Sequence, residues 1–476
     1  MEKTNALRIL LINPNFRRMI GKSERISTIL PPLGIAYIAA VLKKELKEST
    51  DVKILDINAL NLSMGQAIEH IKDFNPDIIG LTAATPTINK CFVIAEAVKK
   101  ILSDSKIVIG GPHPTALPDE SIKKDFIDFV AVGEGEMTML ELAKELMKKG
   151  KKDFRKIKGL VFKDKNRIIK NVPRERIKDL DALPFPAFEL LPLEKYASAS
   201  SKYGRFITIL TSRGCPGMCN YCNKLIFGNA CNMRSAENIF KEIEYLMKKY
   251  RYGEFHIVDD LFTNDRKRIE EFCKMVIKKR MKIKWKCGNG VRVGTVDLEL
   301  LKLMKKAGCY SLSYGIESGS QKILNNIRKG QSLQQCINAV RWTKQAGIEC
   351  IGFFMLGNLG EDEKTMQETI DFAKSLDLDI AQFSILIPFP GTPIRQVIES
   401  EGRIFENSWD RYDNLEGKAI FEHGSLKREL MERFYKKAYK EFYMRQRYML
   451  KRIFKFRTLN EIKNEINGFL TLIEIK

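Results

Sequence analysis

The sequence contains no apolar run long enough to cross a bilayer, since a spanning helix needs about 20 consecutive apolar residues. It also lacks a secretory signal, because the first residues, Met-Glu-Lys-Thr-Asn-Ala-Leu-Arg, are polar and the apolar run after them is short. These two absences argue against a secreted or integral membrane protein. A cytoplasmic location is therefore expected.

A disulfide framework and an excess of acidic residues are missing too. The 476 residues include only ten cysteines, three of them clustered, which suits a reducing compartment. Lys and Arg number 81 against 59 Asp and Glu, a net charge of +22. This balance favours anionic partners such as nucleic acid, lipid headgroups or acidic substrates. A general richness in lysine would give the same charge without any such partner.

Three cysteines stand within eight residues, at Cys215, Cys219 and Cys222, directly after the apolar run 206–210. Thiolates this close together can surround one metal centre, and the neighbouring glycines let the backbone wrap it. An iron–sulfur cube normally takes four thiolates, so three would leave one iron open to another ligand. The alternative is a zinc site, for which Cys231 would have to be the fourth ligand.

Residues 1–149 alternate short apolar runs with helical patterns, which predicts a parallel, doubly wound (Rossmann-like) sheet. Such sheets bind ligands beyond the carboxyl ends of their strands. Small residues gather at those ends, where they allow close approach to a large ligand. The expected strands are 7–12, 52–56, 77–82, 106–110 and 129–132, and the expected helices are 33–42, 64–73, 87–102 and 137–149.

Residues 150–200 are interpreted as a connector with a hairpin at 160–169 and a Pro-rich extended stretch. Residues 201–425 resume the alternation with longer helices, which predicts a partial, TIM-like (β/α)6 barrel. The expected strands are 206–211, 255–259, 283–287, 310–316, 350–356 and 381–387, and the expected helices are 235–250, 265–279, 296–307, 332–346 and 362–376. Residues 426–476 are expected to form a small basic helical region.

The cysteine loop, with the aromatic Tyr221 just before its third cysteine, resembles the radical S-adenosylmethionine (SAM) enzymes. The resemblance implies a 4Fe-4S cluster held by Cys215, Cys219 and Cys222, whose open iron binds SAM and cleaves it to a 5′-deoxyadenosyl radical. The segment 315–319 is similar to the family segment whose Glu and Ser, here Glu317 and Ser318, face SAM. The pair Asp259-Asp260 takes the place of the family's Gly-Gly-Glu motif, which holds the SAM amino group, and helix capping is the other interpretation of Asp260 and Glu317.

The first domain resembles the cobalamin-binding domain of one large branch of that family. The resemblance rests on Pro31-Pro-Leu-Gly-Ile-Ala-Tyr37, Gly110-Gly-Pro-His113-Pro and Val132-Gly-Glu-Gly-Glu136. No Asp-x-His-x-x-Gly sequence is present, so no histidine is expected on cobalt, and His113 is interpreted either as a loop residue or as a corrin contact. The residues expected to contact cobalamin are Thr85, Gly110, Gly111, His113, Gly133 and Gly135.

The resemblance implies a C-methyltransferase that acts on an unactivated carbon and takes its electrons from a partner such as flavodoxin or ferredoxin. An oxidative cyclase or rearrangement enzyme with the same cofactors is the alternative. A tRNA methylthiotransferase would need three cysteines in its first domain, whereas only Cys91 precedes residue 200, so no specific nucleic acid is expected. No catalytic acid or base is assigned, although Cys287, at the rim of the barrel, is weighed as a reactive thiol.

The tail has apolar residues at 426, 430, 431, 434, 435, 438, 439, 442 and 443, a helical stripe. A second helical pattern follows at 459, 462, 466, 469 and 473. One interpretation is that both helices pack on the barrel and shield its open side. The other is that the basic run 445–457 rests on an anionic membrane, at the inner face, and favours a lipid or another hydrophobic substrate.

Overall fold

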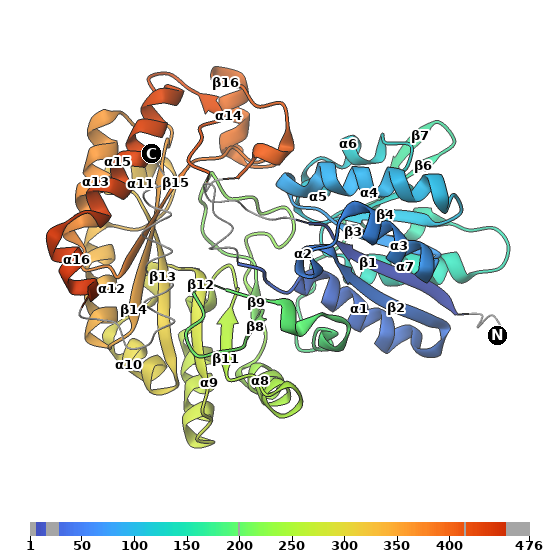
Figure 1. Ribbon diagram of the computed structural model, residues 1–476, viewed down its shortest axis with the longest axis horizontal. Helices are drawn as coiled ribbons and strands as arrows, with labels where there is room; N and C mark the ends of the chain where they lie inside the picture. Colours follow the sequence, from blue (N-terminus) through green and yellow to red (C-terminus); the bar gives the residue numbers. More distant parts are fainter. Residues whose placement is uncertain (1–5, 16–27, 199, 414–415, 454–476) are drawn as a thin grey trace.

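The computed structural model describes residues 6–15, 28–198, 200–413 and 416–453, which form two α/β units (Figure 1). The blue and cyan unit contains the first sheet, and the green to orange unit contains the second. The last helices, in red, lie on the outer side of the second unit.

The first sheet has seven strands in the order β2-β1-β3-β4-β5-β6-β7. β1 to β5 are parallel, and the hairpin β6–β7 adds to β5 in the antiparallel sense. The strands are β1 (Leu7–Asn13), β2 (Thr50–Asp56), β3 (Ile78–Thr82), β4 (Lys106–Gly110), β5 (Phe129–Ala131), β6 (Leu160–Asp164) and β7 (Arg167–Lys170), and the helices are α1 (Leu33–Leu46), α2 (Ile57–Leu60), α3 (Met64–Phe74), α4 (Ile88–Ile101), α5 (Pro112–Ala116), α6 (Pro118–Ile122) and α7 (Glu136–Met147).

Both faces of this sheet are buried, as expected of parallel strands covered by helices. Side chains alternate along β1: Ile9 and Leu11 join the core under α1 and α7, whereas Leu10 and Ile12 join the core under α3 and α4. The prediction of a doubly wound sheet is confirmed.

The hairpin at 160–170 differs from the expectation. The sequence interpretation gave it to a connector, but Val130 of β5 pairs with Val161 of β6, so the hairpin is part of the first sheet. β5 has only three residues and would otherwise be an open edge. A link between the units therefore begins only after β7. The domain limits at 149 and 200 themselves stay predictions.

The second sheet has six parallel strands in the order β15-β14-β13-β12-β11-β8, with helices on its outer face (Figure 1). This order confirms the prediction of an open barrel in which each strand follows its neighbour. The strands are β8 (Phe206–Ile209), β11 (Glu254–Ile257), β12 (Lys284–Val291), β13 (Cys309–Glu317), β14 (Glu349–Leu356) and β15 (Ile380–Ile385), and the helices are α8 (Ala236–Tyr250), α9 (Arg266–Lys278), α10 (Leu298–Lys306), α11 (Gln321–Asn326), α12 (Leu333–Gln345) and α13 (Glu363–Ser375).

After the barrel come α14 (Pro393–Glu401), β16 (Arg403–Ile404), the 3-10 turn η9 (Trp409–Arg411), β17 (Phe421–Glu422), α15 (Arg428–Tyr443) and α16 (Gln446–Ile453). α15 lies along the edge strand β15. The Tyr439 hydroxyl donates to Phe383 O at 3.0 Å, and the Tyr443 hydroxyl donates to Ala381 O at 2.8 Å. The same hydroxyls accept from the N–H groups of Phe383 and Ala381. The expectation that the tail helices pack on the barrel is confirmed for α15, whereas the second expected pattern, 459–473, lies outside the described residues.

The basic run 445–457 is described only in part, because 454–457 lie outside the described residues. Arg445 does not point freely outward: its guanidinium donates to Phe442 O at 2.8 Å and lies 4.4 Å from the centre of the Phe442 ring. Of the helices described, none is both long and apolar enough to span a membrane.

Candidate active site

The cysteine loop begins where β8 ends and is closed by two short strands, β9 (Ser212–Arg213) and β10 (Asn232–Met233). Asp259, after β11, fixes its start by accepting from Thr211 N–H and Ser212 Oγ–H, both at 2.6 Å. Gly214 has φ +89°, and a Cβ there would lie 2.1 Å from Ala230 O, so only glycine fits this crossing. Asp259 is therefore a structural anchor of the loop.

Cys219 and Cys222 are in hydrogen-bond contact through their thiols. This bond, with help from the charges of Lys329 and Arg292 and against the effect of burial, lowers the pKa of the Cys219 thiol to about 6. The same bond and burial raise the pKa of Cys222. Within this bonded pair, Cys219 is therefore the thiol that ionises more easily, and thiolate is the form that binds a metal.

Cys215 belongs to the same loop and is partly exposed. Within the described ranges no three His, Cys, Asp or Glu side chains are close enough together to hold a metal ion. The loop nevertheless offers three thiols in eight residues, two of them already in contact, and this donor set fits an iron–sulfur cluster. Cys231 bonds to Ser212, and burial raises the pKa of its thiol.

Glu317, Lys329 and Tyr221 form a charged group beside these thiols. The Lys329 ammonium lies 2.7 Å from Glu317 Oε1 and donates to the Tyr221 hydroxyl at 3.2 Å. The Lys329 and Glu317 side chains are only 10% and 13% exposed, so their charges are neutralised by each other rather than by water. Glu317 has φ +68°, a left-handed conformation that is rare outside glycine and often found at functional sites.

Arg292 brings a second cation to the cysteine loop. Its guanidinium donates to Gly330 O at 3.4 Å, and a Cβ on Gly217 would lie 2.2 Å from Nη1, so the loop backbone packs directly on it. The sequence analysis gave a role to neither Arg292 nor Lys329. The available signal for Lys329 was the pair Arg328-Lys329 before Gly330, in the loop that follows α11.

Asp260 and Ser318, two of the residues expected to bind SAM, differ from each other in their surroundings. Asp260 is exposed and accepts from the Gly214 N–H at 2.9 Å, which places its carboxylate next to Cys215. Ser318 is fully buried, and its hydroxyl bonds to Thr369 Oγ1 at 3.0 Å and to the Ser320 N–H at 3.1 Å. The Ser318 side chain therefore holds the turn after β13 and does not face the site.

The carboxyl edge of the first sheet lies opposite this loop. A Cβ on Gly391, after β15, would meet Leu225 and Asn223 of the cysteine loop and Ala116 of α5, each within 3.2 Å. The barrel rim, the cysteine loop and the first sheet therefore converge at one place.

The expected cobalamin residues divide into two groups. Gly133 has φ +82°, and a Cβ there would meet no atom within 4 Å, which leaves space for a ligand. Gly111 and Gly135 are constrained by packing, since a Cβ would lie 2.8 Å from Ala83 O and from Ile38 Cδ1 respectively. Gly110 makes ordinary contacts with Ala131.

Thr85 and His113 are buried at the same edge, beneath η9. His113 Nδ1 lies 3.4 Å from Thr85 Oγ1, and His113 Nε2 lies 3.4 Å from Glu120 Oε2. The Trp409 ring covers His113 edge-on at 4.9 Å, and its indole N–H donates to Glu120 at 2.8 Å. His113 is 0% exposed, so it is a packed residue rather than a ligand pointing into open space.

Comparisons with known proteins agree with this geometry. The family model of the B12 binding domain matches residues 24–143, and that of the Radical SAM superfamily matches residues 209–373. The uncharacterized methyltransferase PH0819 of Pyrococcus horikoshii is 34% identical over 466 residues, 98% of each chain. This chain belongs to the cobalamin-binding radical SAM enzymes.

Other members of the family and a solved structure extend the match. The anaerobic magnesium-protoporphyrin IX monomethyl ester cyclase of Rubrivivax gelatinosus is 30% identical over 450 residues, 93% of this chain and 78% of the cyclase. The cobalamin-dependent radical enzyme OxsB, solved with aqua-cobalamin and SAM bound, has the same fold, with a TM-score of 0.78 at 18% identity over 99% of this chain and 72% of OxsB.

As a cobalamin-binding radical SAM enzyme, the protein uses a 4Fe-4S cluster, SAM and cobalamin, and it needs a reducing partner. The structure does not support a role for Cys287 in this chemistry. It is 4% exposed within the apolar core of the barrel, and burial raises the pKa of its thiol well above the ordinary value. A thiol in that state is inert.

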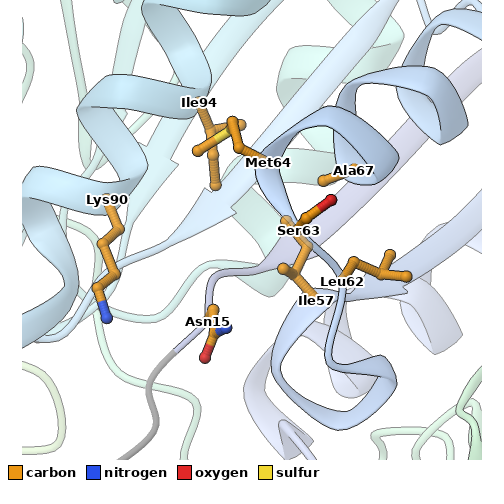
Figure 2. Close-up of a pocket in the computed structure, with 8 residues that line it drawn as sticks. All are labelled: Asn15, Ile57, Leu62, Ser63, Met64, Ala67, Lys90 and Ile94. Carbon is orange, nitrogen blue, oxygen red and sulfur yellow. The ribbon is translucent and has the colours of Figure 1, made fainter.

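One further cavity of this radical SAM enzyme opens at the ends of β1 and β2 (Figure 2). It has a volume of about 390 Å³ and is lined by apolar side chains such as Ile57, Leu62 and Ile94 together with Lys90. It lies between α3 and α4, on the face of the sheet away from α1 and α7. No local pattern predicted this cavity, because its lining residues come from separate segments at 15, 57–67 and 90–94.

Proposed function

We propose that this protein is a cobalamin-dependent radical SAM C-methyltransferase that methylates an unactivated carbon. The observation that carries the proposal is the convergence at Gly391, where a Cβ would lie within 3.2 Å of Leu225 and Asn223 of the cysteine loop and of Ala116 of the first unit. A substrate between the two sheets would be within reach of both cofactors. That arrangement suits a reaction in which one site activates a carbon and the other delivers a methyl group.

Cys215, Cys219 and Cys222 are proposed to hold the cluster, and Tyr221, Asp260, Glu317 and Lys329 to bind SAM. When bound, the cluster supplies the electron that cleaves SAM, and cobalamin supplies the methyl carrier. Glu317 has a carboxylate that can accept hydrogen bonds from ribose hydroxyls, while Lys329 and Arg292 are cations suited to a carboxylate. Asp260, exposed beside Cys215, is suited to an amino group.

Cobalamin is proposed to lie against Gly133 at the carboxyl edge of the first sheet, with no histidine on cobalt. The enclosure of His113 by Thr85, Glu120 and Trp409 supports this proposal, since the imidazole would have to leave a packed site to reach a ligand. Thr85, Gly110, Gly111 and Gly135 would then shape the edge through the backbone rather than through polar contacts.

The second candidate is an oxidative cyclase or rearrangement enzyme with the same cofactors. It is favoured by the 30% identity to a magnesium-protoporphyrin ester cyclase. The residues described at the site are compatible with both outcomes, because the fate of the final radical depends on where the substrate lies.

The electron donor is proposed to be flavodoxin or ferredoxin, and the location the cytoplasm. A hydrophobic substrate and a peripheral contact of 445–457 with an anionic membrane are further proposals. Flotation with anionic vesicles at low and high salt tests the contact, with Arg447→Gln combined with Lys451→Gln as the variant. Equal flotation of this variant and the parent, or no flotation of either, would contradict a charge-driven contact.

The test of the main proposal uses the reconstituted, reduced protein, a cell extract and SAM labelled in its methyl group. Methyl transfer predicts a product that carries the label, detected by mass spectrometry, together with 5′-deoxyadenosine. A cyclase predicts 5′-deoxyadenosine and an altered but unlabelled product. The Cys219→Ala variant is the matched control and should give neither.

A further inference from the structure

A buried cluster of charges joins the two sheets next to the cysteine loop. Arg213 in β9 directly precedes Gly214 and Cys215. Its Nη1 lies 2.6 Å from Glu134 Oε1, and its Nη2 lies 2.6 Å from Glu136 Oε1. Glu134 lies in the loop between β5 and α7 and Glu136 is the first residue of α7, so both come from the first unit. The three side chains are 4–5% exposed, so water does not screen their attraction.

This cluster is held rigidly from several sides. Glu134 uses its second oxygen to accept from the Ile177 N–H at 2.7 Å, and Glu136 is the first residue of α7, where the helix N-terminus favours a carboxylate. The guanidinium carbon of Arg213 also lies 5.1 Å from the centre of the Tyr37 ring and 5.5 Å from that of Phe227. Both terminal nitrogens of Arg213 therefore have a carboxylate partner, and two aromatic rings lie within cation–π distance.

The charged cluster lies only one or two residues along the chain from each of the two cofactor sites. On one side, Arg213 lies two residues from Cys215. On the other, Glu134 stands between Gly133, which faces open space, and Gly135. One carboxylate would be enough to neutralise the guanidinium of Arg213. Two carboxylates, one on each terminal nitrogen, also fix the orientation of the planar guanidinium.

We propose that Arg213, held by Glu134 and Glu136, is a positioning residue that fixes the cysteine loop relative to the corrin-side loop. Arg213 touches neither cofactor in this assignment and acts by setting the separation between the two sites. The glutamates of the segment 132–136 then serve the interface, while its glycines serve the ligand. Only the consequence for the cofactors rests on the proposed function; the mechanical link does not.

The first test measures amide hydrogen exchange in the full-length protein without cofactors. Arg213→Lys keeps the charge but loses the fork, so we expect exchange in 214–220 and in 133–136 to quicken by about 10-fold or more. Arg174→Lys is the matched control, because Arg174 bonds to Glu141 of α7 at 3.0 Å and both partners lie beside the first sheet. It should leave 214–220 unchanged.

The second test uses the reconstituted protein and reads the magnetic interaction between Co(II) and the reduced cluster by electron paramagnetic resonance. A fixed separation gives a single splitting in the parent, and we expect it to broaden at least twofold in Arg213→Lys at unchanged iron and corrin content. Glu136→Gln preserves volume and removes one charge, and it serves if Arg213→Lys does not fold.

Exchange and splitting equal to those of the parent in a folded variant would overturn the proposal. Quicker exchange with an unchanged splitting would limit Arg213 to local stability and would also overturn it. If cobalamin does not bind, the proposed function fails at that point, while the exchange experiment still decides whether Arg213 ties the two loops together.

Discussion

The carboxyl edges of the two parallel sheets face one another, yet they are built from different materials. The barrel edge presents thiols and charges: Glu317 and Lys329 form an ion pair, and the charge of Lys329 acts on Cys219. The edge of the first sheet presents glycines and buried, already bonded side chains such as His113. The same position in two α/β units thus has opposite chemistry.

The difference reflects how each ligand is held. A cluster and a charged small molecule are bound by ligation and ion pairing, which need side chains with ionisable groups. A large macrocycle is bound by close approach of the backbone over a wide surface, which needs small residues and a rigid floor. Substitutions at the barrel edge should therefore affect chemistry, and substitutions at the other edge should affect stability and fit.

The largest effect is expected from the thiols. Cys215→Ala, Cys219→Ala and Cys222→Ala should each reduce iron from about four per chain to background and abolish 5′-deoxyadenosine formation. Cys231→Ala should keep both, because its thiol is bonded to Ser212. Iron and sulfide assays on anaerobically purified protein measure this. Loss of iron in Cys231→Ala would mean that the ligand set is wrong.

A smaller loss is expected from Lys329→Met. It leaves the Glu317 carboxylate, 13% exposed, without its cation, and breaking such a buried pair costs about 3–5 kcal/mol. We expect the Kd for SAM to rise by about 10²-fold, measured by equilibrium dialysis, with iron unchanged. Lys329→Arg keeps the charge and should lose about 10-fold or less. An unchanged Kd in Lys329→Met would make the pair purely structural.

At the edge of the first sheet, Trp409→Ala should act on stability. The half-buried indole covers His113 and bonds to Glu120, so its loss should lower the free energy of unfolding by about 2 kcal/mol. Trp409→Phe keeps an aromatic ring and loses only the N–H donor, so it should lower the free energy of unfolding by about 1 kcal/mol. Urea unfolding measures both. A fall in 5′-deoxyadenosine formation at full stability would instead assign Trp409 to the chemistry.

The smallest effect is expected from His113→Gln. Since His113 is enclosed by Thr85, Glu120 and Trp409, the Co(II) spectrum of the reconstituted protein should be the same in the variant and the parent. Nitrogen hyperfine structure that is present in the parent and lost in His113→Gln would show an imidazole on cobalt. That result would erase the contrast between the two edges.

Much of this architecture can be predicted from local patterns in the sequence. Runs such as 7–12 and 350–356 are apolar without alternation because both faces are covered, and the helices between them show a clear apolar stripe. The cysteine loop was also readable, since its three ligands are local in sequence. The strand order and the open barrel followed from the alternation of strands and helices.

The features that could not be predicted from the sequence depend on contacts between segments that are far apart in the chain. Trp409 covers His113 across almost 300 positions, and the side of the turn on which Ser318 falls is decided by Thr369 of α13. Lys329 reaches Glu317 only because the chain turns back after α11. The hairpin at 160–170 was found, but its partner strand was not, since pairing depends on which edge is free.

The hydroxyls of Tyr439 and Tyr443 of α15, which bond to the edge strand β15, affect whether another chain can add to the sheet. An uncovered edge of six parallel strands would be a template on which a second copy, or an unfolded chain, could add a strand. With the backbone groups of Ala381 and Phe383 already bonded, that template is blocked at two successive outward positions. The barrel can thus remain open for a substrate without becoming a seed for polymerisation.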